Sequence, residues 1–282
     1  MRDKKTPRKR RVGAFAFPLA AIGIAAVLFV DNSGLFITNT LYKLGVPGLP
    51  EAFSGFRIVQ ISDLHGEEFG ENSNRLVDRV RSQNPDIIAL TGDIADFSTD
   101  MSVLERLIPQ LVEIAPVFYV SGNHEWGSRT ISKLEAILAQ SGATYLKNKY
   151  IPLEKNGSRI ILCGVEDPNS WADIKHPDEL VSDLRTEYPD DTVLLLGHRN
   201  YWVTEYPNLD ASVILCGHAH GGIVRIPFVG GLLDTTHRLF PKYASGVYES
   251  GSYKMVVSRG LSDSIPVPRF LNTPELVTIE LQ

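Results

Sequence analysis

The 282-residue sequence contains only two cysteines, Cys163 and Cys216. Each one ends an apolar run and precedes a glycine, a position typical of a buried strand thiol. A disulfide between them would have to cross the predicted core, so we expect both thiols to be free. The shortage of cysteine excludes a disulfide-stabilised scaffold, and the cellular compartment must be inferred from other features.

Basic residues are concentrated at the amino terminus, and the rest of the chain has no comparable basic run and an excess of acidic residues. Residues 1–11 hold seven Lys or Arg and one Asp, a net charge of +6, whereas the whole chain carries −5. The remaining residues therefore carry −11. Because contacts to phosphates supply most of the non-specific affinity for nucleic acid, an acidic body argues against a polynucleotide partner.

Charged residues are absent from Val12 to Val30. Nineteen residues at 1.5 Å rise span about 28 Å, close to the thickness of a bilayer core. This segment predicts an uncleaved transmembrane signal anchor; a cleaved signal peptide is the alternative, although no clear small-x-small cleavage site follows. The positive-inside rule keeps the basic tail in the cytoplasm.

These features predict four parts of the chain: a basic cytoplasmic tail over 1–11, the transmembrane anchor over 12–30, a linker over 31–54 and a catalytic domain over 55–282. The linker is rich in Asn, Gly and Pro and is expected to become an edge strand where it enters the domain. We therefore expect a single-pass protein of the cell membrane with its domain on the extracytoplasmic side. The sequence does not indicate an oligomeric state.

Metal-capable side chains follow five apolar runs, which are expected to be buried strands. In chain order these side chains are Asp63 and His65; Asp93 and Asp96; Asn123, His124 and Glu125; His198; and His218 and His220. Five of the seven histidines thus lie at strand ends. Histidines scattered through a core would not be sorted in this way, so the pattern predicts a metal site.

The residue types restrict the metal. Carboxylate and amide oxygens combined with several imidazoles suit manganese, iron or zinc better than calcium or magnesium. The set is too large for one tetrahedral ion. Two divalent ions roughly 3.5 to 4 Å apart, bridged by a carboxylate and a water, would use all of it and would suit displacement at phosphorus.

The strand-end blocks resemble those of the calcineurin-like metallophosphoesterase superfamily. The resemblance covers about residues 55–282, and its blocks are Asp63-Leu64-His65, Gly92-Asp93-Ile94-Ala95-Asp96, Gly122-Asn123-His124-Glu125, Gly197-His198 and Gly217-His218-Ala219-His220. Later motifs, at Gly221-Gly222, Ile226-Pro227, Arg259-Gly260-Leu261 and Pro274-Glu275-Leu276, are similar to its membrane-associated or exported bacterial phosphodiesterase branch, which includes a pyrophosphatase acting on a lipid-linked nucleotide.

The chain alternates strands and helices and then becomes rich in short strands after His220. This order predicts an α/β fold of two mixed sheets packed face to face, with helices outside. The resemblance likewise implies a four-layer α/β/β/α sandwich, here preceded by the transmembrane helix. The metal ligands would then come from loops along one rim of the sheets.

Combined with the chemistry, the resemblance implies a role for each site residue. Asp63, His65 and His220 would hold the first metal, and Asn123, His198 and His218 the second. Asp93 would bridge the two ions. A metal-bridging hydroxide would attack phosphorus in line, and His124 would stabilise the phosphoryl oxygens or protonate the leaving oxygen.

Three other residues have more than one interpretation. Asp96 is either an acceptor that orients His124 or a ligand, or a turn cap. Glu125 is expected at the surface or behind the ligands, not on a metal. Arg199 stands near a position where many relatives have proline, and it is either a substrate-binding phosphate clamp or a surface charge.

The predicted function is that of a dinuclear-metal phosphohydrolase at the cell envelope, acting mainly on phosphodiesters. The apolar segments Phe228–Leu233 and Leu239–Pro241 would either touch lipid or pack against a sheet edge. With the anchor nearby, lipid-linked phosphodiesters or pyrophosphates are included as substrates. The alternatives are a phosphomonoesterase or nucleotide pyrophosphatase, and a non-enzymatic metal-stabilised membrane scaffold.

Overall fold

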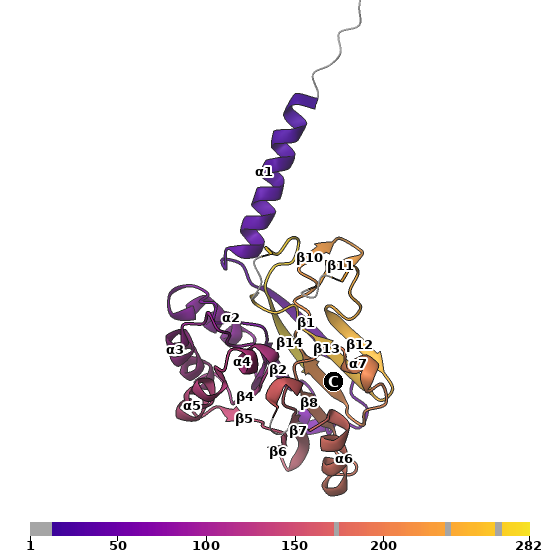
Figure 1. Ribbon diagram of the computed structural model, residues 1–282. Helices are drawn as coiled ribbons and strands as arrows, with labels where there is room; N and C mark the ends of the chain where they lie inside the picture. Colours follow the sequence, from indigo (N-terminus) through magenta and orange to yellow (C-terminus); the bar gives the residue numbers. More distant parts are fainter. Residues whose placement is uncertain (1–12, 172–174, 235–237, 263–266) are drawn as a thin grey trace, which may run out of the picture.

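The computed structural model describes residues 13–171, 175–234, 238–262 and 267–282, with side chains described from residue 21 onward. Helix α1 (Gly13–Asn32) projects from a body built on two sheets (Figure 1). The basic tail predicted over 1–11 lies outside the described residues. Within the described part of the chain, no helix is long and apolar enough to cross a membrane. The anchor over 12–30 stays a prediction.

The first sheet has six strands in the order β1-β14-β2-β3-β4-β5. Strands β2 to β5 run parallel to one another, whereas β14 is antiparallel to β2 and parallel to β1. The parallel strands therefore end at the same edge. The bounds are β1 Thr38–Leu44, β2 Arg57–Ile61, β3 Ile87–Thr91, β4 Val117–Val120, β5 Thr144–Tyr145 and β14 Glu275–Leu281.

The second sheet has the order β12-β13-β9-β8-β7-β6. Strands β7, β8, β9 and β13 are parallel, and the hairpin partners β6 and β12 run antiparallel to their neighbours. The bounds are β6 Lys149–Lys155, β7 Ser158–Gly164, β8 Val193–Leu196, β9 Val213–Cys216, β12 Gly246–Ser250 and β13 Tyr253–Val257. A separate hairpin joins β10 (Val224–Ile226) to β11 (Gly230–Leu233).

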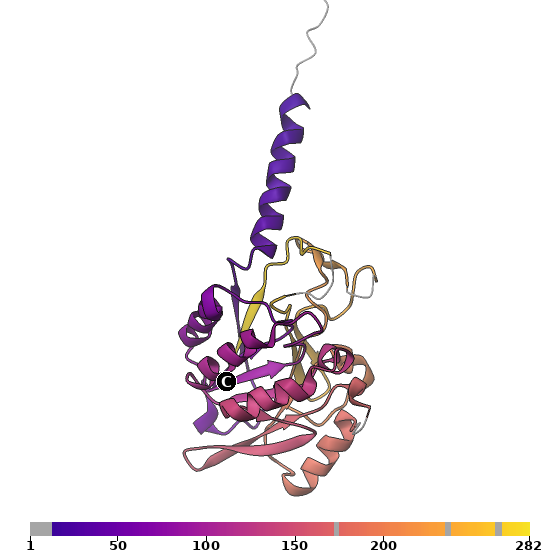
Figure 2. The same cartoon turned by 60° about the vertical axis from the view of Figure 1, so that its left-hand side comes forward.

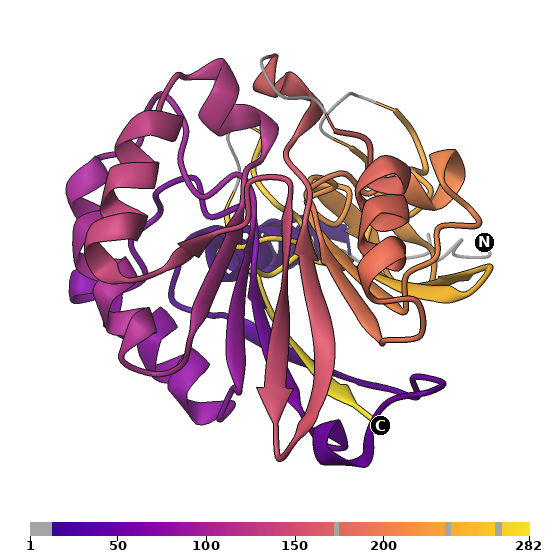
Figure 3. The same cartoon turned by 90° about the horizontal axis from the view of Figure 1, so that it is seen from below.

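Helices cover the outer faces of both sheets, as Figure 3 shows from below. The first sheet carries the helices between its strands, and the second carries α6 and α7. The helical bounds are α2 Asn74–Ser82, α3 Met101–Val112, α4 Asn123–Gly127, α5 Ile131–Ser141, α6 Pro177–Glu187 and α7 Trp202–Glu205, with short 3-10 turns at η1 Glu51–Phe53, η2 Glu71–Ser73 and η3 Pro168–Ser170.

Three apolar cores account for this layering. The central core lies between the sheets and includes Phe53, Leu162 and Ile279. One outer core packs α2, α3 and α5 on the first sheet, and the other packs α6 and α7, with Trp202, on the second. Burial of these apolar faces is the main force that holds the four layers together.

The prediction of a mixed α/β fold with two sheets is confirmed. The segment predicted as a linker over 31–54 contains β1, whose seven residues pair with β14 at the edge of the first sheet. Cys163 and Cys216 are buried and unbonded to each other, as predicted.

Candidate metal centre

The predicted ligands meet at one edge of the two sheets because each follows the carboxyl end of a parallel strand. Strands β2, β3 and β4 of the first sheet and β8 and β9 of the second all deliver residues there. The backbone turns sharply at this edge. Left-handed φ angles, between 48° and 70°, occur at Asp63, His65, Asp93, His218 and His220. Such conformations are costly for non-glycine residues and cluster at functional sites.

One cluster contains Asp63, His65, Asp93 and His220, each of which offers one ligand atom. These atoms all lie within 4.8 Å of one another. Nε2 of His220 is 3.3 Å from a carboxylate oxygen of Asp63, and all four residues are buried. The arrangement brings together residues up to 157 positions apart in the sequence.

A second cluster contains Asp93, His198 and His218 within the same 4.8 Å limit. Nε2 of His198 lies 3.0 Å from Oδ2 of Asp93. Burial disfavours the charged imidazole of His198, but the adjacent Asp93 carboxylate outweighs burial and raises its pKa to about 10. The negative charge of Asp93 therefore stabilises a positive charge in this cluster. It would stabilise a bound metal cation in the same way.

Asp93 belongs to both clusters, the position predicted for a bridging ligand. Its neighbours are arranged around it: the backbone N–H of His124 donates to Oδ1 at 2.8 Å. Gly122 approaches so closely that a Cβ there would lie 2.2 Å from the same oxygen. Asn123, between these two residues, is carried on the first turn of α4.

Several buried atoms of the two clusters have no hydrogen-bond partner among the described residues. They are both ring nitrogens of His65, Oδ2 of Asp93, Oδ1 of Asn123 and Nε2 of His198. Unpartnered buried polar atoms are rare in folded proteins and call for an explanation. Metal ions would satisfy Nε2 of His65 and the named atoms of Asp93, Asn123 and His198, while Nδ1 of His65 lies 3.3 Å from Oδ2 of Asp96, so the residues present fit a metal centre.

Backbone carbonyls fix the orientation of two imidazoles. Nδ1 of His198 lies 2.9 Å from the carbonyl oxygen of Thr91, and Nδ1 of His220 lies 2.9 Å from that of Ser262. A carbonyl only accepts, so Nδ1 carries a proton and Nε2 faces the carboxylates, where it would bind a metal once it is deprotonated. This is the usual arrangement of metal-binding histidines. Sequence patterns alone could not identify these carbonyls.

Asp96 lies against a predicted ligand. Its Oδ2 is 3.3 Å from Nδ1 of His65, and its Oδ1 accepts from the backbone N–H of Ser98 at 2.8 Å. One oxygen of the Asp96 carboxylate thus lies where an acceptor that orients His65 would lie, and the other caps the turn at Ser98. His124 is half-buried beside them, with its ring 4.9 Å from that of His65. Burial lowers the pKa of His124.

Arg199 is paired with a buried carboxylate next to the second cluster. Its guanidinium donates to the buried carboxylate of Asp167 at 2.8 Å, and another of its nitrogens lies 3.1 Å from Nε2 of His218. Only 12% of its side chain is exposed. Its charge is paired with Asp167 and lies beside His218, and the role of Arg199 as a phosphate clamp stays a prediction. The sequence analysis missed Asp167, which no local pattern marks.

Glu125 is not at the surface, which corrects one of its two predicted positions. The carboxylate is fully buried and accepts from the backbone N–H groups of Asp93, Ile94, Ala95 and Gly122 at 2.6 to 3.3 Å. Burial and the nearby Asp93 raise its pKa to about 8, whereas the N–H donors favour the ionised form. Glu125 thus holds together the two loops that carry Asp93 and Asn123.

Comparisons with known proteins agree with this geometry. Residues 56–222 match the family described as calcineurin-like phosphoesterase. A Bacillus subtilis (strain 168) protein, named uncharacterized metallophosphoesterase YkuE, is 28% identical over 258 residues, which cover 87% of this chain and 86% of YkuE. Phosphodiesterase YaeI of Escherichia coli (strain K12) is 28% identical over 234 residues, covering 80% of this chain and 82% of YaeI.

A third relative, from Danio rerio, is named transmembrane protein with metallophosphoesterase domain. It is 26% identical over 231 residues, which cover 74% of this chain and 51% of the relative. The matched region thus spans about half of that protein. Because the family match covers more than half of this chain and the clustered Asp and His residues fit the family's dinuclear divalent metal centre, the chain belongs to the calcineurin-like phosphoesterases and is a metal-dependent phosphoesterase.

Proposed function

We propose that this protein is a membrane-anchored phosphodiesterase. The observation that carries the proposal is the pair of buried clusters that share Asp93, with His124 beside them. A carboxylate common to two cation sites, with an imidazole nearby, suits hydrolysis at phosphorus. The similarity to phosphodiesterase YaeI supports a diester as the substrate.

Seven residues would hold the two metal ions. Asp63, His65 and His220 would bind the first, Asn123, His198 and His218 the second, and Asp93 both. Manganese, iron or zinc suit these ligands. When bound, the ions would neutralise phosphoryl charge and activate water.

His124 would act on the phosphoryl group or the leaving oxygen. Its lowered pKa favours the neutral imidazole near pH 7, which carries one N–H donor. That donor would stabilise charge developing on a phosphoryl oxygen, whereas transfer of a proton to the leaving group would require the imidazolium form. Asp96 would keep His65 in its binding orientation through the contact to Nδ1.

The membrane part of the proposal rests on the segment Val12–Val30, which has no charged residue. Where its side chains are described, Ile22, Ile24 and Phe29 of α1 are exposed, so the body of the protein does not cover them. The seven basic residues before this segment would stay in the cytoplasm, with the domain outside. Lipid-linked phosphodiesters or pyrophosphates would then be within reach.

The test is to prepare the full chain free of metal, restore manganese, iron, zinc or magnesium in turn, and compare a chromogenic bis-ester with its mono-ester. We expect metal-dependent turnover of the bis-ester and a rate about a hundredfold lower in His124→Ala. His176→Ala is the matched control, because His176 is exposed and bonds Tyr206.

Faster turnover of the mono-ester would favour the phosphomonoesterase alternative. If the protein bound two metals but hydrolysed neither ester, it would be a pyrophosphatase or a non-enzymatic scaffold. A full rate in His124→Ala would remove the role given to that imidazole.

A further inference from the structure

Exposed apolar side chains gather beside the foot of α1. Phe228 is fully exposed and Val229 is 61% exposed at the turn between β10 and β11. Leu239 and Phe240, in the segment that follows the hairpin, are exposed by 66% and 61%. Figures 1 and 2 both place the hairpin next to the end of α1 that joins the body. We call these four residues the apolar tip.

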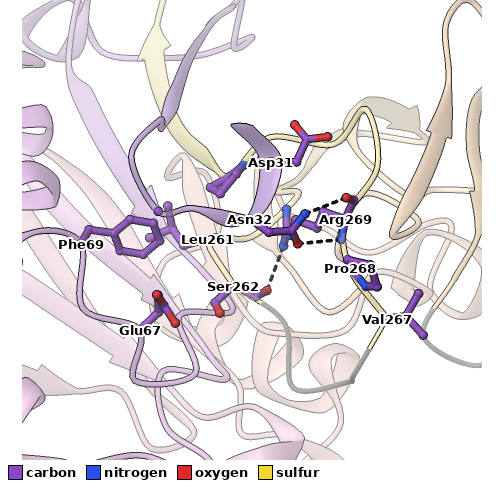
Figure 4. Close-up of a pocket in the computed structure, with 11 residues that line it drawn as sticks. Asp31, Asn32, Glu67, Phe69, Leu261, Ser262, Val267, Pro268 and Arg269 are labelled. Atoms are coloured by element: carbon purple, nitrogen blue, oxygen red, sulfur yellow. Dashed lines mark hydrogen bonds between the residues drawn. The ribbon is translucent and has the colours of Figure 1, made fainter. Parts of the chain in front are cut away.

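The end of α1 that joins the body is hydrogen-bonded to it, close to the apolar tip. The side chain of Asn32 donates to the carbonyl of Arg269 and accepts from its backbone N–H, both at 2.9 Å (Figure 4). Buried Asp31 accepts from the backbone N–H of Asn272 at 3.0 Å and from the hydroxyl of Thr273 at 2.7 Å. These bonds attach the last turn of α1 to the segment 269–273 of the body.

We propose that the apolar tip docks in the headgroup layer of the bilayer that α1 crosses. This inference rests on the anchor proposed above. A helix that crosses the bilayer and ends at Asn32 brings the body's adjoining end to the membrane surface. Apolar side chains that are exposed in water would there be buried at the headgroup and acyl boundary.

The charges around the apolar tip suit an anionic membrane surface. Arg238 and Lys242 are exposed and flank Leu239 and Phe240 in the sequence. Basic side chains beside buried apolar ones are typical of segments that bind anionic lipids from the side. The chemistry that the apolar tip recognises is therefore a bilayer containing phosphate headgroups.

The same segments connect the membrane surface to the metal centre. A cavity of about 460 Å³ is lined by His218 and Arg199 together with Asp234, Arg238, Lys242 and Tyr243. In the sequence, β10 begins four residues after the proposed ligand His220, so the hairpin with the apolar tip follows directly from the metal centre. A phosphoester headgroup leaving the lipid layer would thus enter a cavity, with Arg238 and Lys242 in its lining, that borders the second metal cluster. The proposed substrate class is a phosphodiester carried on a membrane lipid.

The depth of the apolar tip is measured with spin labels on the full chain in vesicles of phosphatidylcholine and phosphatidylglycerol. Phe228→Cys and Phe240→Cys each provide one accessible thiol, since Cys163 and Cys216 are buried. Glu154→Cys is the control, because Glu154 is exposed on β6 at the end opposite α1 (Figure 1). We expect the first two labels to be relaxed by oxygen and shielded from a water-soluble nickel complex, and the control label to show the reverse.

The docking proposal is refuted if the labels at 228 and 240 are as accessible to the nickel complex as the label at 154. It is also refuted if the chain does not associate with the vesicles. This readout needs no turnover, so it separates the two proposals. Shielded labels on a chain that hydrolyses no diester would support docking and refute the proposed phosphodiesterase.

A second measurement tests delivery of the substrate. In the double variant Phe228→Ser and Val229→Ser, hydrolysis of a soluble bis-ester should be unchanged, because neither residue contacts the metal clusters. Hydrolysis of a fluorogenic phosphatidyl diester in vesicles should fall about tenfold. An unchanged rate on the vesicle substrate would overturn the proposal that the apolar tip presents lipids to the site.

Discussion

The carboxylate of Glu125 accepts a 2.6 Å hydrogen bond from the backbone N–H of Ile94. The same side chain accepts from the N–H groups of Asp93 and Gly122, at 3.1 and 2.9 Å. One buried carboxylate thus joins the loop after β3 to the loop after β4. These loops carry the shared ligand Asp93 and the proposed ligand Asn123. The distance between the two loops therefore depends on Glu125, which is not itself a proposed metal ligand.

We expect Glu125→Ala to destabilise the protein by about 3 kcal/mol, because several buried N–H donors lose their acceptor. Metal affinity should fall as well, since the spacing of the two loops is no longer fixed. Urea unfolding and metal titration measure the two effects. Glu135→Ala is the control, because Glu135 is exposed in α5 and makes only a 3.8 Å ion pair with Lys147. Equal stability of the two variants would contradict this role.

Asp96→Asn should weaken metal binding roughly 10- to 100-fold, the range found when a group that orients a metal-binding histidine is changed. The loss follows from replacing the carboxylate oxygen that lies 3.3 Å from Nδ1 of His65. Competition with a coloured chelator measures the affinity. Asp100→Asn, which changes an exposed cap of α3, should leave it unchanged. If Asp96→Asn bound metal as tightly as the parent, Asp96 would be a turn cap alone.

Gly217→Ala should displace Asp63. A Cβ at residue 217 would lie 1.9 Å from Oγ of Ser62 and 2.3 Å from Oδ2 of Asp63, and neither buried group has room to move. Overpacking of this kind costs about 1 to 3 kcal/mol. Thermal unfolding should show the loss, and metal analysis should show less metal per chain. Gly127→Ala is the control, since a Cβ there meets nothing within 4 Å.

Asp167→Ala should cost about 3 to 5 kcal/mol, because it leaves the Arg199 charge buried without its partner. The comparison is Asp191→Ala, which breaks the pair with Arg159, whose side chain is 50% exposed. An exposed pair contributes about 1 kcal/mol or less. Urea unfolding of both variants tests the difference. Similar losses of unfolding free energy in the two variants would show that water screens the Asp167–Arg199 pair as it does the Asp191–Arg159 pair.

Glu166 should make the metal-free protein less stable as pH rises. Burial raises its pKa from 4.5 to about 7, although Tyr145 and Ser121 donate hydrogen bonds to it. The folded state therefore binds more protons than the unfolded state between these values. The stabilisation is complete below pH 4.5 and is lost as pH rises through 7, a change of at most about 3 kcal/mol.

Glu166→Gln should flatten this dependence, because the neutral amide does not titrate. Urea unfolding between pH 4.5 and 8 in the presence of a chelator gives the slope. Glu154→Gln, at an exposed position, should keep the slope of the parent. A parent slope that persisted in Glu166→Gln would assign the pH dependence to another group.

The local parts of the site could be predicted from the sequence. The run Ile58–Ile61 followed by Asp63 and His65 identifies a buried strand and two metal-capable side chains within a few residues. Parallel strands end at one edge of a sheet, so five such runs were enough to expect a shared site. The two-sheet α/β architecture followed from the same alternation of strands and helices.

Contacts between distant loops were beyond sequence reasoning. Asp167 was missed because it meets Arg199 only when the loops after β7 and β8 lie side by side. The carbonyls of Thr91 and Ser262 were missed because every residue has a carbonyl and nothing in the sequence marks the one that faces an imidazole. Glu125 was predicted at the surface or behind the ligands, and only the fold distinguished the two.

The sequence by itself therefore determined which segments form buried strands, which metal-capable residues follow them and where an uncharged segment precedes the domain. These are properties of short stretches, set by side-chain chemistry and by the period of burial. The tertiary structure decided which groups orient those residues, how β1 and β14 complete the first sheet, and where the apolar tip lies relative to α1. Those depend on the packing of two sheets, in which the contacting residues are often more than 30 positions apart.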